Sequence, residues 1–297
     1  MPRIAFVGLG NMGGAMAANV LRAGIPLTLY DPNSKRLPEL VKLGGVVASS
    51  FESLAEADIV ITMIPDDDTL SAISLGEKGL VGILKPNALH VSMSTVSSQI
   101  SRAVSAEHKA AGQRFVAAPV FGRPDVATAG QLGIVAAGDT EAIANECKPL
   151  FEAMGRITYV AGEDPGAANI IKLGANFLIG ATIEALGEVY ALIRKQNVDP
   201  DLFQQIITTT FFPSPVYRTY GSMISSDNYD PPGFNMLLAL KDLTLITDAA
   251  DEVRVALPMA NIVRNNVLTS IGRGMQDMDY AALGRLAIDN AGIKSKK

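Results

Sequence analysis

The stretch Gly8-Leu9-Gly10-Asn11-Met12-Gly13 decides how the first half of the chain is expected to fold. An apolar run over residues 3–8 leads into it, and a short apolar run that ends in glycine is typical of a buried parallel strand. A helical pattern follows and stops at Gly24, and a second apolar segment, residues 26–30, closes on Asp31. The order of strand, glycine turn, helix, strand and acid predicts the first βαβ unit of a doubly wound sheet.

The G-x-G-x-x-G spacing gives each glycine a role in holding a dinucleotide. Gly8 permits the tight turn, Gly10 lets the backbone approach a pyrophosphate, and Gly13 lets the helix pack on its strand. The pyrophosphate would lie at the helix N-terminus, where backbone N–H groups point outwards. Asp31 stands where a carboxylate would accept hydrogen bonds from the adenosine ribose. The sequence therefore predicts a dinucleotide site in this unit.

The residues around the second strand bear on which dinucleotide binds. The Asp31 carboxylate would repel a 2′-phosphate, which favours NAD. Lys35 and Arg36 lie just downstream and could clamp that phosphate, cover the adenine or remain solvated. We therefore expect NAD, with NADP less favoured but not excluded.

Strand-like and helical segments alternate through the first half of the chain, which predicts an α/β domain with a doubly wound parallel sheet. The further strands are expected at 58–64, 88–92, 115–118, 133–137 and 157–160, and the further helices near 35–44, 69–74, 97–112 and 139–154.

After about residue 163 the alternation stops and the pattern becomes all-helical. A helix from Pro165 to about Gln196 would measure about 45 Å at 1.5 Å per residue. The other helices are expected at 200–210, 214–225, 233–253, 257–273 and 279–291. We expect a dinucleotide-binding Rossmann domain over 1–162 and an all-α substrate and dimerisation domain over 163–297 that opens with this long interdomain helix.

The long helix also bears on assembly. Gly174, Gly180 and Gly187 lie inside it, at spacings that could let another helix approach closely. A helix of this length exceeds the depth of a small domain, so part of its apolar surface is expected to meet another subunit. We expect a homodimer or a larger symmetric assembly.

Composition excludes several other classes of protein. The 297 residues are 48% hydrophobic and 19% charged, enough for two domains with sizeable cores. The net charge of −5 offers no basic field for nucleic acid. Cys147 is the single cysteine, and His90 and His108 are too few and too isolated for a histidine metal cluster. No apolar run reaches the roughly 18 residues that span a bilayer. We expect a cytoplasmic protein with no metal, membrane or nucleic-acid partner.

Lys172 and Asn176 are the candidate catalytic pair. They lie four residues apart near the start of the long helix and so share one face. A lysine there could relay a proton between a substrate hydroxyl or carbonyl and solvent, and Asn176 could orient it or bind the substrate. Spacing alone favours the plainer interpretation of a surface lysine beside a helical asparagine.

Four motifs, in a fixed order along the chain, favour the catalytic interpretation of Lys172 instead. Residues 8–20 form the extended glycine fingerprint, and Met93-Ser94-Thr95, Gly166 through Lys172 to Asn176, and Lys241-Asp242-Leu243 follow it. Together they resemble the β-hydroxyacid dehydrogenase family, which includes 3-hydroxyisobutyrate and tartronate semialdehyde dehydrogenases. The resemblance implies a Rossmann domain, a long connecting helix, an all-α domain and Lys172 as the catalytic acid/base.

The resemblance also implies cofactor contacts beyond the glycine turn. Thr95 belongs to the family's Ser-Thr loop near the nicotinamide, and Lys241 corresponds to the family's lysine beside the cofactor and substrate. Met63-Ile64-Pro65 ends a strand at the sheet edge where the family's cofactor packs. The residues predicted to contact the cofactor are therefore Gly8, Leu9, Gly10, Asn11, Met12, Gly13, Asp31, Met63, Ile64, Pro65, Thr95 and Lys241.

The chain departs from the family in the substrate-binding segment. Where the family has D-A-P-V-S-G-G, residues 117–123 read A-A-P-V-F-G-R. Either Arg123 takes over carboxylate recognition as a bidentate partner, or Phe121 makes a less polar pocket while Arg123 points to solvent or pairs with Asp125. Tyr217, in an aromatic cluster after residue 210, is a further candidate for lining the pocket. The predicted substrate-binding residues are Val120, Phe121, Gly122, Arg123 and Tyr217.

These observations predict an NAD(P)-dependent oxidoreductase that transfers a hydride between a nicotinamide cofactor and a small hydroxy acid or its carbonyl counterpart. Lys172 would act as the general acid/base. Two alternatives stay open: an aldehyde or imine reductase with an atypical pocket, and a dinucleotide-binding module without catalysis.

Overall fold

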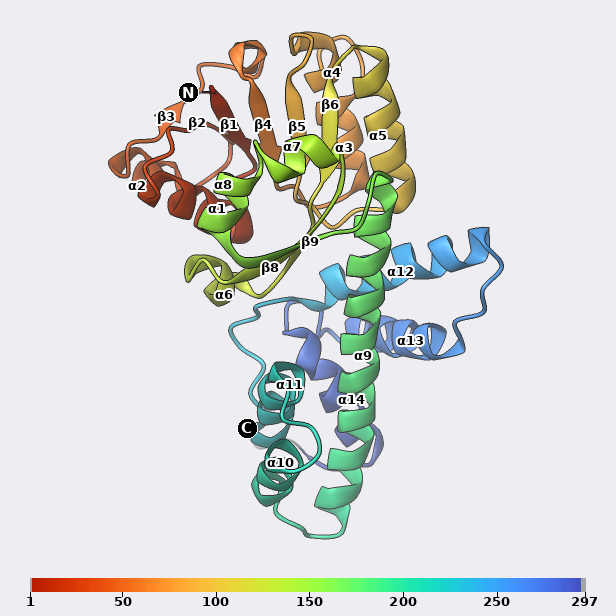
Figure 1. Ribbon diagram of the computed structural model, residues 1–297. Helices are drawn as coiled ribbons and strands as arrows, with labels where there is room; N and C mark the ends of the chain where they lie inside the picture. Colours follow the sequence, from red (N-terminus) through yellow and green to blue (C-terminus); the bar gives the residue numbers. More distant parts are fainter. Residues whose placement is uncertain (1, 295–297) are drawn as a thin grey trace. The chain divides into compact units, whose positions relative to one another are not determined.

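The computed structural model describes residues 2–294 (Figure 1). The chain forms two compact units, Met1–Lys172 and Leu173–Lys297. The first unit has cores on the faces of a β-sheet, and the second has a core of its own built from helices. The predicted combination of an N-terminal Rossmann sheet with an all-α second part is confirmed.

The first unit is built on a twisted sheet whose central strands run parallel. Its strands are β1 (Ile4–Val7), β2 (Thr28–Tyr30), β3 (Val46–Val47), β4 (Ile59–Thr62), β5 (Leu89–Ser92), β6 (Arg114–Ala117), β7 (Val120–Phe121), β8 (Leu132–Gly138) and β9 (Gly155–Val160). Six of them follow the order β3-β2-β1-β4-β5-β6 with parallel pairing throughout. The strands β1, β4 and β5 are buried over their whole length. This burial explains the apolar runs of β1 and most of β4. Thr62 at the end of β4 and His90 and Ser92 in β5 are buried polar residues.

The far edge of the sheet adds antiparallel pairing that the alternation did not indicate. β8 lies antiparallel to both β6 and β7, and β9 runs parallel to β8. Parallel neighbours need a long crossover, usually a helix. Between β6 and β8 the chain forms only the short strand β7 and the five-residue helix α6 (Pro124–Thr128). The chain therefore returns in the opposite direction.

Helices connect and cover the strands of the first unit. They are α1 (Asn11–Arg22), α2 (Leu37–Lys42), α3 (Asp67–Ser74), α4 (Leu80–Ile83), α5 (Ser98–Ala110), α6, α7 (Thr140–Ala144) and α8 (Lys148–Met154), with a 3-10 helix at Glu52–Glu56. The single helix expected at 139–154 is wrong, because the chain breaks there into α7 and α8. Pro149 lies in the first turn of α8, where its missing N–H costs no hydrogen bond, and so it starts a new helix.

The second unit is all-helical, as expected. Its helices are most of α9 (Pro165–Lys195), then α10 (Pro200–Thr209), α11 (Pro215–Ser226), α12 (Met236–Glu252), α13 (Pro258–Gly272) and α14 (Leu283–Asn290), with a 3-10 turn at Tyr280–Ala282. Two of the three glycines singled out in α9 allow close packing. A Cβ on Gly187 would lie 2.6 Å from the Cα of Gly284, and one on Gly180 would lie 1.9 Å from the hydroxyl oxygen of Tyr280.

Helix α9 leaves much apolar surface uncovered by its own chain. By length and composition it could cross a membrane, a test that core helices of soluble proteins also pass, and a third of its most apolar window is buried. Ile171, Leu178, Val189 and Leu192 are exposed. Their spacings of seven, eleven and three residues place all four on one face of the helix.

A chain of buried polar side chains crosses the first unit between β4, β5 and α5. His90 Nε2 lies 3.0 Å from Thr62 Oγ1, and His90 Nδ1 lies 2.9 Å from His108 Nε2. His108 Nδ1 lies 2.7 Å from Gln113 Oε1, while the Gln113 amide donates to the carbonyls of Val81 and Leu84. Because an amide oxygen only accepts, His108 donates from Nδ1, His90 donates from Nδ1, and Thr62 donates to His90. The two histidines, isolated in the sequence, are neighbours in space and fully paired as neutral rings.

Because both histidines are buried as neutral rings, we expect the folded protein to become less stable in mild acid. Burial, reinforced by the neighbouring His108, holds the pKa of His90 well below its ordinary value, and burial lowers the pKa of His108. Around and below pH 6.5 the two imidazoles therefore bind protons in the unfolded protein but stay neutral in the folded protein. We expect the free energy of unfolding, from urea titrations, to fall by roughly 1.5–3 kcal/mol between pH 7.5 and 5.5.

The double variant His90→Phe/His108→Leu is the matched control, because the chain holds only these two histidines. It should lose most of the dependence between pH 7.5 and 5.5. Equal slopes for the wild type and the double variant would contradict the assignment.

Candidate dinucleotide and active site

The glycine turn between β1 and α1 is shaped by close backbone contacts. Gly8 has a φ of +87°, and a Cβ there would lie 2.3 Å from the carbonyl oxygen of Met63. A Cβ on Gly13 would lie 1.9 Å from the carbonyl oxygen of Gly8. At Gly10, by contrast, a Cβ would meet nothing described within 4 Å. Gly8 and Gly13 are thus required for packing, and Gly10 leaves open backbone where a ligand can approach.

The start of α1 suits an anion. Gly10 is its N-cap, and among the described residues neither a capping side chain nor an acidic residue occupies the first turn. The first backbone N–H groups of a helix have no partner within the helix and carry its positive dipole end. Asn11 is exposed and Met12 half-buried beside this turn. The residues present therefore fit the pyrophosphate of a dinucleotide.

Asp31 is held in place by the same turn. Its Oδ2 accepts from the backbone N–H of Leu9 at 2.7 Å, and its Oδ1 accepts from that of Asn33 at 2.9 Å. Each carboxylate oxygen keeps a second lone pair for a ribose hydroxyl. The stem of Arg36 lies over the first turn of α1, since a Cβ on Gly14 would be 2.3 Å from its Cδ. An acid and a guanidinium therefore flank the expected adenosine end.

The carboxyl ends of β4 and β5 bring two more predicted segments to the turn. The backbone N–H of Ile64 donates to Ser94 Oγ at 2.9 Å, which ties the end of β4 to the loop after β5. Met63 contacts the glycine turn, and Pro65 is exposed beside it. Thr95 follows the buried Ser94 and is half-exposed. Ligands of doubly wound sheets bind at this edge.

Lys172 is buried rather than on the surface. Its exposed fraction is 8%, and its Nζ lies 4.7 Å from the ring centroid of Phe121. An ammonium over an aromatic face is attracted by the ring quadrupole, most strongly where water is excluded. Phe121 is on β7, where it pairs with Gly133 of β8. The ring that replaces the family's serine hydroxyl therefore covers the candidate catalytic lysine.

The first turns of α9 are fixed on α5 by contacts that the sequence did not indicate. Arg102 donates from Nε and Nη2 to the Asp164 carboxylate, with Nη2 to Oδ2 at 2.8 Å. A Cβ on Gly166 would lie 2.7 Å from the guanidinium carbon of Arg102, so glycine leaves room for this pair. Asn169 also donates to Ser101 across the two helices. These contacts set the position of Lys172 further along α9.

The segment around Arg123 has unusual backbone geometry. Gly122 has a φ of +145°, and a Cβ there would lie 2.7 Å from Leu132 Cδ2. Arg123 is half-buried, and its Nη1 is shielded from solvent. Val120 is buried. The side chain of Arg123 therefore does not extend freely into bulk water.

The second unit holds Asn176 through Asp242, to which the sequence motif assigns no role of its own. Asn176 Nδ2 donates to Asp242 Oδ2 at 2.6 Å, and Asp242 Oδ1 forms an ion pair with Lys241 Nζ at 3.1 Å. Asp242 is 4% exposed. With the amide nitrogen engaged there, the Asn176 oxygen is left as an acceptor for a ligand. The adjacency of Asp242 to Lys241 in the Lys-Asp-Leu motif was the available signal.

Tyr217 packs against another aromatic residue of the same unit. Its ring is stacked on Phe212 with centroids 4.5 Å apart, and Tyr220 is buried in the helical core. A substrate contact of Tyr217 stays a prediction.

Metal and thiol chemistry find no support in the described residues. No group of three or more histidine, cysteine, aspartate or glutamate side chains that could hold a metal is formed within residues 2–294. Burial raises the pKa of the Cys147 thiol to about 12, so this group stays protonated and unreactive.

The first unit has a glycine turn that suits a pyrophosphate. The helices that follow carry the buried Lys172 and an asparagine held by Asp242. This combination fits a nicotinamide-dependent dehydrogenase. Comparison with known protein families supports the same class of enzyme. Residues 3–162 match the NAD-binding domain of 6-phosphogluconate dehydrogenase, and residues 166–287 match the NAD-binding domain of NADP-dependent 3-hydroxyisobutyrate dehydrogenase. The chain belongs to the β-hydroxyacid dehydrogenase family and is an NAD(P)-dependent oxidoreductase of that type.

Individual relatives match over nearly their whole length. An uncharacterized oxidoreductase of Bacillus subtilis is 40% identical over 95% of this chain and 98% of its own. The 3-hydroxyisobutyrate dehydrogenase of Pseudomonas aeruginosa is 32% identical over 89% of this chain and 91% of its own. The solved Mycobacterium tuberculosis 3-hydroxyisobutyrate dehydrogenase with L-serine has a TM-score of 0.85 at 26% identity, covering 96% of this chain and 98% of its own.

The glycine turn yields a prediction that separates binding from folding. Gly10→Ala should fold normally, because its new methyl group meets no neighbour, yet weaken NADH binding by about tenfold or more if the pyrophosphate passes over it. Gly13→Ala should also lower the melting temperature, because its Cβ must displace the Gly8 carbonyl. NADH fluorescence titration and thermal unfolding measure the two effects.

Gly272→Ala, which also meets nothing described within 4 Å, is the matched control and should leave NADH binding unchanged. Wild-type affinity in Gly10→Ala would show that the dinucleotide does not pass over this turn.

Proposed function

We propose that the protein oxidises a small hydroxy acid, or reduces its carbonyl counterpart, with Lys172 as the general acid/base. The observation that carries this proposal is the burial of Lys172 beside the 120–123 segment. When bound, the nicotinamide supplies the hydride acceptor or donor. In oxidation the substrate hydroxyl gives its proton to Lys172 Nζ as the C–H hydride departs, and in reduction Lys172 returns that proton to the alkoxide oxygen.

Asn176 assists by binding or orienting the substrate in this proposal. Its amide nitrogen is engaged by Asp242, which fixes the oxygen as the acceptor that a hydroxyl or the lysine can use. We propose residues 1–162 as the dinucleotide-binding domain and 163–297 as the substrate and dimerisation domain. NAD is the proposed cofactor, because the Asp31 carboxylate faces the glycine turn, with NADP not excluded.

We further propose that Arg123 recognises the substrate carboxylate. Its shielded Nη1 disfavours a side chain that merely points to solvent, and a guanidinium can bind a carboxylate with two parallel hydrogen bonds. Phe121 supports the second candidate function, an aldehyde or imine reductase, because it removes a hydroxyl from the pocket wall. Substrates with and without a carboxylate distinguish these two functions.

Lys172→Ala should reduce turnover by roughly 10²–10⁴-fold, the usual contribution of a general acid/base. The assay follows NADH and NADPH formation from 2- and 3-hydroxy acids, including 3-hydroxyisobutyrate and L-serine, beside alcohols of similar size without a carboxylate. Lys195→Ala, an exposed lysine on the same helix, is the control and should leave turnover unchanged. Near-normal turnover in Lys172→Ala would remove this residue from the mechanism, and activity confined to carboxylate-free substrates would favour the second function.

We propose that a second copy of the chain covers the apolar face of α9 and makes the protein a cytoplasmic homodimer or larger homo-oligomer. Four large apolar side chains lie along that face, and leaving them in water is unfavourable. The ionisable residues of the helix, Lys172 and Glu184 among them, suit a protein interface better than a bilayer.

The doubly substituted variant Leu178→Glu/Leu192→Glu should dissociate the oligomer, because it places charges in an apolar interface. Sedimentation velocity would then report a monomer. Leu202→Glu, at another exposed leucine, on α10, should leave the assembly intact. An unchanged sedimentation coefficient in the α9 variant would locate the interface elsewhere.

A further inference from the structure

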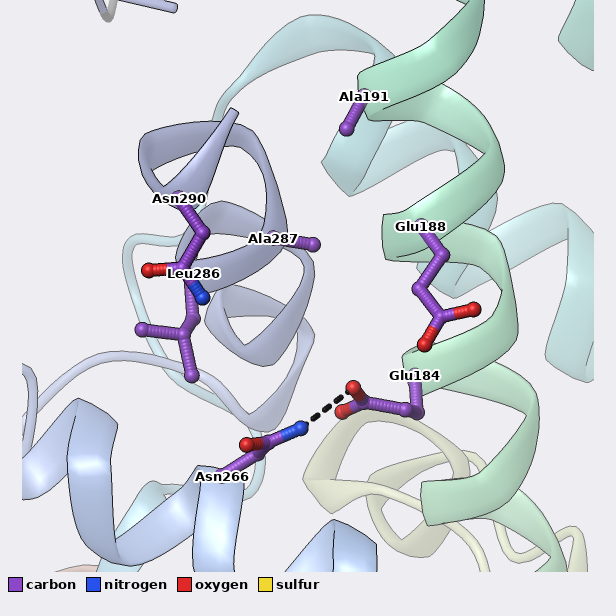
Figure 2. A pocket seen from close by; sticks show the side chains of 7 residues that line it. All are labelled: Glu184, Glu188, Ala191, Asn266, Leu286, Ala287 and Asn290. Atoms are coloured by element: carbon purple, nitrogen blue, oxygen red, sulfur yellow. Dashed lines mark hydrogen bonds between the residues drawn. The ribbon is translucent and has the colours of Figure 1, made fainter. Parts of the chain in front are cut away.

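The second unit contains a polar pocket between α9, α13 and α14 (Figure 2). Its volume is about 330 Å³, room for a small organic molecule. Figure 2 shows the Glu184 side chain pointing from α9 towards Asn266 of α13, with Glu188 one turn further along α9. The residues lining the pocket are Glu184, Glu188, Ala191, Asn266, Leu286, Ala287 and Asn290. Two of these seven side chains are acidic and none is basic, so the pocket is negatively charged when both are ionised.

Glu184 has a buried carboxylate oxygen that lacks a hydrogen-bond donor among the described residues. It is 8% exposed, and its Oε1 accepts from Asn266 Nδ2 at 2.6 Å. Its Oε2 is buried and has no hydrogen-bond partner among the described residues. Glu188 lies one turn further along the same face of α9. A buried carboxylate oxygen without a donor is costly, and a second carboxylate beside it adds repulsion.

We propose that this pocket binds a small organic cation, a primary ammonium on a short carbon chain. The ammonium donates to Glu184 Oε2 and to the Glu188 carboxylate, which supplies the missing donor and cancels the repulsion between the two acids. The carbon chain lies against Ala191, Leu286 and Ala287. Glu184 lies twelve residues beyond Lys172, about 18 Å along α9 at 1.5 Å per residue, so this site is separate from the proposed reaction.

The lining disfavours a metal ion. Calcium takes six to eight oxygen ligands. Asn290 Oδ1 already accepts from Arg273 Nη2 at 3.0 Å, which leaves few oxygens for a metal ion. The alanine and leucine side chains offer no ligands. A volume far larger than one ion and a partly apolar wall match an ammonium attached to carbon.

Calorimetric titration of the full-length protein with n-butylammonium chloride at pH 8 tests the proposal. We expect saturable binding that Glu184→Gln weakens by about tenfold or more, the loss expected for one charge-assisted hydrogen bond. Glutamine keeps an oxygen for Asn266, and circular dichroism verifies the fold. Glu252→Gln, an exposed acid on α12, is the matched control and should bind as the wild type does.

Two further arms use the same titration. Burial raises the pKa of Glu184, opposed by the Asn266 hydrogen bond and reinforced by Glu188, so binding should weaken as the pH falls from 8 to 5. Neutral 1-butanol, potassium and magnesium should not compete with n-butylammonium. Absence of binding, equal binding in Glu184→Gln, or displacement by 1-butanol, potassium or magnesium would each overturn the proposal. None of these readouts depends on catalytic turnover.

Discussion

The close approach of the Gly8 carbonyl to Gly13, where an added Cβ would lie 1.9 Å from the oxygen, is the constraint on which the first unit depends. It lets α1 begin directly at the end of β1, so that the backbone N–H groups of the helix face the sheet edge. The same turn contacts Met63 and holds Asp31, so the ends of three adjacent strands share one backbone frame. A single added methyl group at Gly13 would disturb all of these contacts together.

Local patterns were sufficient for most of the fold. The strands β1 and β4 are buried and are apolar over all or most of their length, which marks them as central strands. Each helix of the second unit begins or ends near a proline, glycine or capping side chain. The strand directions at the β8 edge of the sheet were harder to predict from the sequence. The direction of β8 depends on how little chain separates it from β6, and apolar pattern carries no information about strand direction.

The residues of the candidate site could be predicted only in part from the sequence, for a similar reason. Lys172 and Asn176 share a helix, so their spacing already relates them. Asp242 and Arg102 act across 66 and 62 residues of sequence, on Asn176 and Asp164 respectively, and only the fold reveals these pairs. The same holds for His90 and His108, which are not neighbours in the sequence but form one buried hydrogen-bonded pair in the fold. Resemblance to a family supplied roles for residues, and the structure supplied their partners.

The continuity of α9 has a consequence for how this protein can vary in evolution. Each residue inserted into the helix turns everything beyond it by about 100° and advances it by about 1.5 Å. An insertion between Lys172 and Asn176 would place the two side chains on different faces, whereas an insertion in the loops around it would not. Changes in chain length should therefore accumulate in loops such as 227–235, and the helix should diverge by substitution alone.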